Sequence, residues 1–224
     1  MNKVLDFFKS FIGIIIYFAV NIFFSSILKV IDKSNQPLFI LVLCLSEIVL
    51  LLILLLVFRK RIKKDFIDFD KNYKKYLSYG IKIWLIGLLV MGLSNSIIYR
   101  FISEPVNQQA NELIISLYPL YSIISIIICG PFVEEIVFRL SFKEHIKNKY
   151  IFLILTTLIF AGIHIVPSMT SAIELLYFIP YGALALSFGI ILQKTDNIFT
   201  TVLIHTFHNT MAILLITITT MLGV

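Results

Sequence analysis

The chain consists of long uncharged apolar runs separated by short polar segments. Each run has roughly 17 residues or more, the length that crosses about 30 Å of hydrocarbon as a helix. We therefore predict an all-α, polytopic transmembrane helical bundle with about seven spans, an eighth being possible. The expected spans are Phe11–Val30, Pro37–Phe58, Tyr79–Tyr99, Leu113–Leu140 (interrupted), Tyr150–Val166, Ile173–Gln193 and Ile198–Leu222.

The composition supports a membrane protein and excludes several other classes. Of 224 residues, 59% are hydrophobic and only 14% are charged, whereas a soluble domain carries about 25% charged residues. The short alternating segments of an outer-membrane barrel are absent. Cys44 and Cys129 each lie inside an apolar run, so we interpret them as small buried hydrophobic residues and not as a disulfide or metal pair.

The distribution of basic residues predicts the orientation in the membrane. The linker from Arg59 to Lys82 holds nine of the nineteen basic residues. Lys and Arg favour the cytoplasmic side, which predicts a cytoplasmic N-terminus and an external C-terminus. Six more basic residues fall on the cytoplasmic side in this arrangement: Lys3, Lys9, Lys143, Lys147, Lys149 and Lys194. Three face outward: Lys29, Lys33 and Arg100.

The same linker suggests a partner and a division of the chain. Its aromatic and basic side chains are typical of a segment on the surface of a membrane with anionic lipids, and we expect no nucleic acid. We predict a first region, residues 1–110, of transmembrane helices and basic linker, and a helical core over residues 111–224 that holds the candidate site described below. Both belong to one integral membrane domain.

The fourth apolar run contains a pair of adjacent acids, Glu134 and Glu135, followed by Arg139. A charged side chain in hydrocarbon costs about 2.5–3.5 kcal/mol on insertion scales, so such residues usually have a function. Gly130-Pro131 comes just before them, and proline suits the first turn of a helix. We therefore expect a kink or break at Gly130-Pro131, with both acids in the first turns of a second half-helix.

Further polar residues occur at a similar depth in later runs. Glu134, His164 and His205 lie roughly 12 to 22 Å from the predicted cytoplasmic ends of their helices, at 1.5 Å per residue. Three different helices thus place a polar group in one layer of the bundle, which is a necessary condition for a shared site.

The spacing within each helix refines this prediction. Glu135 and Arg139 are four residues apart and can neutralise each other, which leaves Glu134 on a different face. His205 and Asn209 are also four apart and can point into one pocket, while the side on which His208 lies stays open.

These residue types together match amide hydrolysis. A carboxylate and an imidazole can activate a water molecule, and a second imidazole with a carboxamide can donate to the oxyanion of a tetrahedral intermediate. No nucleophilic serine or cysteine stands at a clear position, and the His-Glu-x-x-His zinc motif is absent.

Structural interpretations remain open for each group. Glu134, Glu135 and Arg139 could form a structural ion-paired cluster, and a lone His164 is more often a core histidine. His205 and Asn209 could provide ordinary hydrogen bonds between helices. Glu47, in the second run, has no evident partner on its helix, and we favour a structural role for it.

Three motifs together resemble the CPBP family of intramembrane proteases, also called Abi. This family includes the CAAX prenyl endopeptidases of the Rce type and bacteriocin-processing and self-immunity proteins. The motifs are Glu-Glu-x-x-x-Arg at residues 134–139, Phe-x-x-x-His at 160–164 and His-x-x-x-Asn at 205–209. The resemblance covers about Ser116 to Ala212, and no motif position departs from the pattern.

The resemblance implies a role for each motif residue. Glu134 would be the general base, His164 would help to hold the water, and His205 and Asn209 would form the oxyanion hole. Glu135 and Arg139 would orient the site. We expect that no cofactor is required; if zinc were bound, Glu134, His164 and His205 would be its ligands.

The resulting hypothesis is a multi-pass intramembrane endopeptidase of a cell membrane that cleaves a peptide or membrane-anchored substrate near the cytoplasmic interface. The small size of the chain favours a bacterial origin. The alternative is a non-catalytic membrane scaffold or self-immunity protein that binds a peptide or a sensor kinase. A proton- or ion-coupled transporter is a third class, although we find no paired repeat halves.

Overall fold

All the regular structure in residues 7–32 and 34–222, which the computed structural model describes, is helical. The prediction of an all-α bundle is therefore confirmed. Six of these helices are long and apolar enough to cross a membrane. They begin and end as follows: α2 (Ile12–Val30), α3 (Gln36–Val57), α4 (Arg59–Ile98), α9 (Lys149–Ile165, extended by a 3₁₀ turn), α10 (Phe178–Thr195, preceded by the 3₁₀ segment Ala172–Tyr177) and α11 (Ile198–Leu222).

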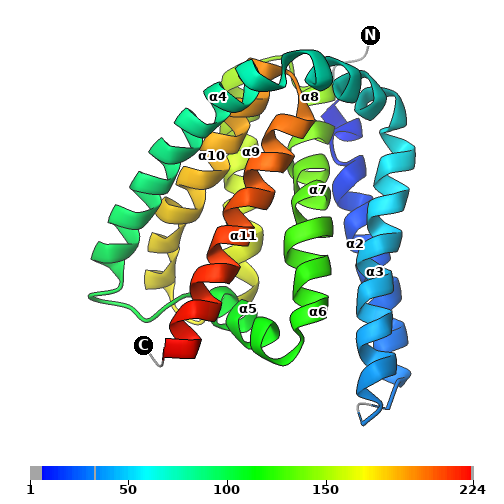
Figure 1. Ribbon diagram of the computed structural model, residues 1–224, viewed down its shortest axis with the longest axis vertical. Coiled ribbons are helices and arrows are strands. Elements are labelled where there is room, and N and C mark those ends of the chain that lie inside the picture. The colour runs from blue at the N-terminus through cyan, green and yellow to red at the C-terminus, as the bar shows by residue number, and fades with distance from the viewer. Residues whose placement is uncertain (1–6, 33, 223–224) are drawn as a thin grey trace.

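The helices form two groups with a central column between them (Figure 1). Helices α4, α9, α10 and α11 pack against one another on one side, and α2 and α3 form a hairpin on the other. The column between them consists of the short helical segments from Pro119 to Leu140, in the fourth apolar run. Gly13 lets α2 approach this column closely, because a Cβ atom there would lie 3.1 Å from Cα of Val137.

The fourth run is the main departure from prediction. Its segments are α5 (Val106–Leu117), α6 (Pro119–Ser122), η1 (Ile123–Cys129, a π-helix), α7 (Gly130–Glu135), η2 (Ile136–Leu140, a π-helix) and α8 (Ser141–His145). No single one of them is long enough to count among the six spans, so the predicted total of seven stays a prediction.

At Gly130-Pro131, where a kink or break was expected, the backbone changes from π-helix to α-helix without a break, and α7 begins at Gly130 and contains both acids. Helical backbone continues through Gly130, and the chain instead turns at Tyr118 (φ −136°, ψ 63°), directly before Pro119. A residue before proline avoids the helical region, which explains the turn at Tyr118. Pro131 is tolerated because the preceding π-helix widens the turn: the N–H of Gly130 donates to the carbonyl of Ser125, five residues earlier.

The predicted linker and third span form one 40-residue helix, α4, which begins at Arg59. The span expected from Tyr79 is the second half of this helix. Figure 1 shows the first part of α4 crossing the top of the bundle before the rest descends along α10. No proline interrupts this segment, and ion pairs four residues apart, such as Arg61 with Asp65, support a continuous helix.

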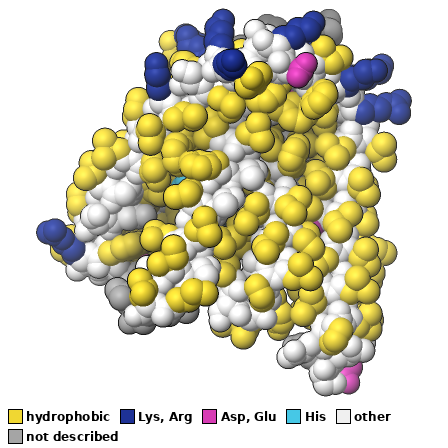
Figure 2. Space-filling view, viewed as in Figure 1, with side chains coloured by type: hydrophobic (Ala, Val, Ile, Leu, Met, Phe, Trp, Pro, Cys, Tyr) yellow, Lys and Arg dark blue, Asp and Glu magenta, His cyan; other side chains and the backbone are white. Residues whose placement is uncertain are grey.

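Lysine and arginine side chains gather at the end of the bundle where α4 crosses, and hydrophobic side chains cover its flanks (Figure 2). We call this the basic end, and the opposite end, where α5 lies, the α5 end. The chain is a multi-pass membrane protein. The cytoplasmic assignment of the basic end stays a prediction; Lys3 and Lys33, which entered that assignment, lie outside the described residues.

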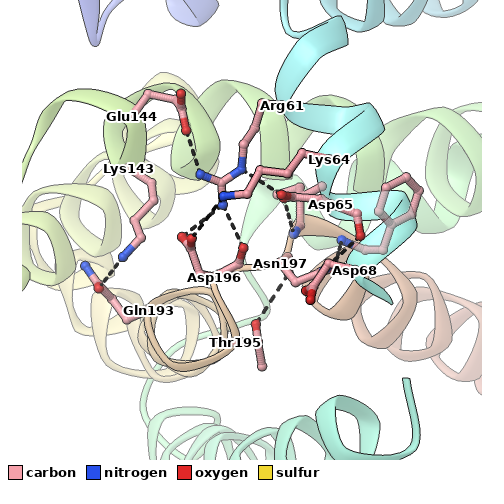
Figure 3. Close-up of polar contacts among 12 residues, drawn as sticks. Arg61, Lys64, Asp65, Asp68, Lys143, Glu144, Gln193, Thr195, Asp196 and Asn197 are labelled. Atoms are coloured by element: carbon pink, nitrogen blue, oxygen red, sulfur yellow. Dashed lines mark hydrogen bonds and ion pairs between the residues drawn. The ribbon is translucent and has the colours of Figure 1, made fainter. Parts of the chain in front are cut away.

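A group of ion pairs centred on Arg61 fastens the basic end (Figure 3). Arg61 contacts Asp65 on its own helix at 2.8 Å, Glu144 of α8 at 2.8 Å and Asp196 at 2.9 Å. Asp196 adopts a left-handed conformation (φ 47°) in the turn from α10 to α11. One guanidinium group thus links α4, α8 and the turn that begins α11.

The start of α11 is fixed by α4 as well. The carboxylate of Asp65 accepts a hydrogen bond from the backbone N–H of Ile198 at 3.0 Å, and Asn197 donates to the carbonyl of Asp65 at 2.7 Å. Unpaired N–H groups at a helix start need such acceptors. This arrangement sets the position of α11, on which His205 lies two turns later.

Candidate active site

Side chains from three helices line one cavity of about 630 Å³ in the bundle. Glu134 comes from α7, His164 from α9 and His205 from α11. The residues that the sequence placed in one layer are therefore brought to one cavity by the fold. The carboxylate of Glu134 is partly exposed to this cavity, with Oε2 3.6 Å from Nε2 of His205.

Glu135 connects His205 to Arg139. Its Oε1 lies 2.6 Å from Nη1 of Arg139 and accepts a hydrogen bond from Nδ1 of His205 at 2.9 Å. The side chains of Glu135 and Arg139 are both 0% exposed, so this pairing is shielded from solvent. Because Nδ1 of His205 is engaged by Glu135, its Nε2 points toward Glu134.

Aromatic rings hold the buried guanidinium and the imidazole in place. The guanidinium carbon of Arg139 lies 4.3 Å from the ring centroid of Phe160 and 5.3 Å from that of Phe188. Phe188 also stacks on the ring of His205 at 4.8 Å. These contacts matter because Nε and Nη2 of Arg139 have no hydrogen-bond partner among the described residues.

His164 has a defined orientation. Its Nδ1 donates to the carbonyl of Phe160, one turn earlier, at 2.8 Å. The ring also packs against those of Phe160 and Tyr181, with centroid distances of 4.5 and 5.5 Å. With Nδ1 protonated, a neutral ring has its lone pair on Nε2, and this atom can accept a proton or a hydrogen bond from a water molecule.

Asn209 has a structural contact that its motif does not reveal. Its Nδ2 donates to the carbonyl of Ile126 at 2.9 Å. In the π-helical pattern of this segment, that carbonyl would accept from residue 131, which is a proline without an N–H. Asn209 therefore completes the hydrogen bonding at the proline and still lines the cavity, with a second amide hydrogen available.

His208, whose side the sequence left open, also lines the cavity. Its Nδ1 accepts a hydrogen bond from the indole Nε1 of Trp84 in α4 at 3.4 Å. This bond ties α11 to α4 beside the site.

Glu47 lines the same cavity, although the sequence favoured a structural role for it. It lies on α3, and its Oε1 accepts from the hydroxyl of Tyr121 at 3.3 Å. The helical pattern of α3 could not reveal this, because the partners come from other helices. Other lining side chains that sequence reasoning missed are Tyr17, Asn21, Asn95, Asn107, Gln108, Asn111 and Tyr181.

The possible zinc ligands do not fit a metal ion in this arrangement. Among residues 7–32 and 34–222, no three His, Cys, Asp or Glu side chains form a group that could hold one. Glu134 approaches His205, but His164 does not join them as a third ligand. The expectation that no cofactor is required stays a prediction.

Comparison with known families found one match. Residues 116–211, a little less than half of the chain, match the family described as type II CAAX prenyl endopeptidase Rce1-like. The matched segment runs from the end of α5 to the middle of α11 and contains all three motifs. Over this segment the chain is similar to a family of proteases that act within the membrane.

Neither the curated proteins nor the solved structures include a match to this chain. The similarity to a known family therefore depends on the matched segment and its motifs.

Proposed function

We propose that the chain is an intramembrane endopeptidase that hydrolyses a peptide bond with a water molecule activated by Glu134 and His164. One observation carries the proposal: the Glu134 carboxylate faces Nε2 of His205 in a cavity that His164 also lines. The family match over residues 116–211 supports the same reaction class.

In the proposed reaction, a water molecule binds between the Glu134 carboxylate and Nε2 of His164. Glu134 removes a proton as the water oxygen attacks the substrate carbonyl carbon, whose C=O bond becomes a single bond to an oxyanion. Glu134 then passes the proton to the amide nitrogen as the C–N bond breaks. The products are a carboxyl group and an amine, and Glu134 returns to its carboxylate form.

In this proposal, His205 and Asn209 stabilise the oxyanion. As an imidazolium, His205 can donate from Nδ1 to Glu135 and from Nε2 into the cavity, and the second amide hydrogen of Asn209 is available. Glu135 and Arg139 act through His205, because their pairing fixes the tilt of its ring. They are positioning residues.

We further propose a peptide or membrane-anchored protein as substrate and the bacterial cell membrane as location. The exposed lysines and arginines of the basic end would contact anionic lipids on the cytoplasmic side. Nothing in the charge pattern calls for nucleic acid.

The first test compares Glu134→Gln with wild type in proteoliposomes, using unmodified peptides and mass spectrometry to detect cleavage. We expect Glu134→Gln to lower the rate at least about a thousandfold, since a general base and its charge are lost together. Glu104→Gln, an exposed acid at the α5 end that does not line the cavity, is the matched control and should cleave normally. Normal cleavage by Glu134→Gln would refute the assigned role.

A scaffold or self-immunity protein makes the opposite prediction. If the chain only binds a peptide or a sensor kinase, His205→Ala should retain function in cells, whereas a protease should lose it.

A further inference from the structure

The part of the cavity nearer the α5 end has an unusual wall for a membrane bundle. Four carboxamide side chains line it: Asn95 in the last turn of α4, and Asn107, Gln108 and Asn111 on α5. We call these four residues the amide wall. All four are partly buried. Polar side chains inside a membrane bundle commonly mark the path of a substrate or ion.

Much of the hydrogen-bonding capacity of the amide wall is unused. Asn95 and Asn111 have no side-chain hydrogen bond among the described residues, and Asn107 makes one long contact of 3.4 Å to the hydroxyl of Tyr181. Gln108 donates to Glu112 at 2.9 Å. Each carboxamide offers two donors and an acceptor, so most of these groups are available to whatever occupies the cavity.

Other residues that line the cavity are aliphatic, among them Ile126 of η1 and Ala212, Ile213 and Ile216 of α11. A cavity lined by both amides and aliphatic side chains suits an extended peptide. Main-chain N–H and C=O groups can pair with the amides, and alternate side chains can contact the aliphatic residues.

The two ends of the cavity differ in access. Toward the basic end, the segment that follows Glu134 is fully buried, including Val137, Arg139 and Leu140. Toward the α5 end, Asn111 and Ile126 are only partly buried, and Ile123 and Ile128 of η1 are exposed. A substrate therefore reaches Glu134 past the amide wall.

An isoprenoid chain fits this wall poorly. It has no hydrogen-bonding groups, so it would remove water from the amides and leave them unpaired. A peptide main chain replaces those water contacts with hydrogen bonds of similar kind.

We propose that the amide wall binds the main chain of an unlipidated peptide segment as it extends toward Glu134. This inference rests on the proposed function and narrows its substrate to a peptide that needs no prenyl group.

The test uses the full chain in proteoliposomes and a mixed-sequence library of short unmodified peptides, with cleavage detected by mass spectrometry. The peptide cleaved fastest is then made in two forms, one unmodified and one with a farnesyl group on a C-terminal cysteine. We measure kcat and KM for wild type, for the double variant Asn95→Leu/Asn111→Leu, and for Gln109→Leu. Gln109 lies on α5 away from the cavity, where its amide contacts the carbonyl of Glu104, and serves as the matched control.

We expect the double variant to raise KM for the unmodified peptide roughly tenfold, the effect of losing one or two hydrogen bonds, with little change in kcat. Gln109→Leu should match wild type, and the farnesyl group should not increase kcat/KM. Peptide binding to Glu134→Gln, with and without the two leucines, gives a second readout that is independent of turnover.

Three results would overturn the inference. An unchanged KM and unchanged peptide binding in the folded double variant would remove the role of the amide wall while leaving the protease intact. A kcat/KM that rises when the farnesyl group is added would assign the cavity to a lipidated substrate. Absence of cleavage by wild type, or full activity of Glu134→Gln, would refute the proposed function and this inference with it.

Discussion

The two ends of the cavity are built from different kinds of contact. Toward the basic end, Glu135 and Arg139 form an ion pair without solvent access, and aromatic rings cover the guanidinium on two sides. Toward the α5 end, carboxamides face the cavity with few partners. The ion pair at the basic end fixes His205 in one orientation, whereas the carboxamides at the α5 end are available to a ligand. The most rigid part of the cavity is therefore the part next to the proposed catalytic residues.

The largest effect should come from breaking the buried ion pair. Arg139→Ala leaves the buried Glu135 carboxylate without its cation, which we expect to destabilise the fold by about 3–5 kcal/mol. Thermal unfolding in detergent would measure this loss. Gln109→Ala on α5 is the control and should change stability by less than about 0.5 kcal/mol. Equal stability of Arg139→Ala and Gln109→Ala would mean that the fold depends no more on the contacts at the basic end than on those at the α5 end.

A second variant should change the position of Glu134, and with it the rate of cleavage, without unfolding the protein. A Cβ atom added at Gly130 would lie 2.4 Å from the carbonyl oxygen of Ser125, so the backbone of η1 must shift. Glu134 follows one turn later, and displacements of about 1 Å at a reacting group can cost about a hundredfold in rate. We expect Gly130→Ala to lower kcat by roughly that factor while the protein still folds, as judged by size-exclusion chromatography. Wild-type kcat in this variant would show that the π-helix does not set the position of Glu134.

A smaller effect should come from the basic end. Arg61→Ala removes the group that links α4, α8 and the α10–α11 turn. The partners Glu144 and Asp196 are 34% and 52% exposed, so we discount the ion pairs for screening and expect a loss of about 1–2 kcal/mol. Unfolding at low and high salt would test this, since only the wild type should lose stability as salt rises. If Arg61→Ala lost as much stability with added salt as the wild type, charges other than Arg61 would be the cause of the salt response.

Much of the fold follows from local sequence pattern. The expected boundaries of α2, α3, α9 and α11 agree with the structure within one or two residues, because long apolar runs and polar turns define them without reference to neighbours. The helical segments of the interrupted fourth run could not be predicted in this way. Proline normally ends a helix, but the π-helix before Pro131 and the amide of Asn209 compensate for it, and both depend on tertiary contacts.

The candidate site shows the same division. Motif spacing indicated the pairing of Glu135 with Arg139, which the structure contains at 2.6 Å. It did not indicate that Glu135 also accepts from His205, since these residues lie 70 positions apart. The cavity positions of Glu47 and Asn95 likewise depend on how α3 and α4 face their neighbours.

The sequence by itself determined that this protein is a helical membrane bundle with acids, histidines and an asparagine at one depth, because helix length and residue depth are local properties at 1.5 Å per residue. Only the tertiary structure decided which side chains meet, which end of the cavity is buried and where its amides face. Those outcomes depend on the rotation of each helix about its axis, and this rotation is set by packing against the other helices.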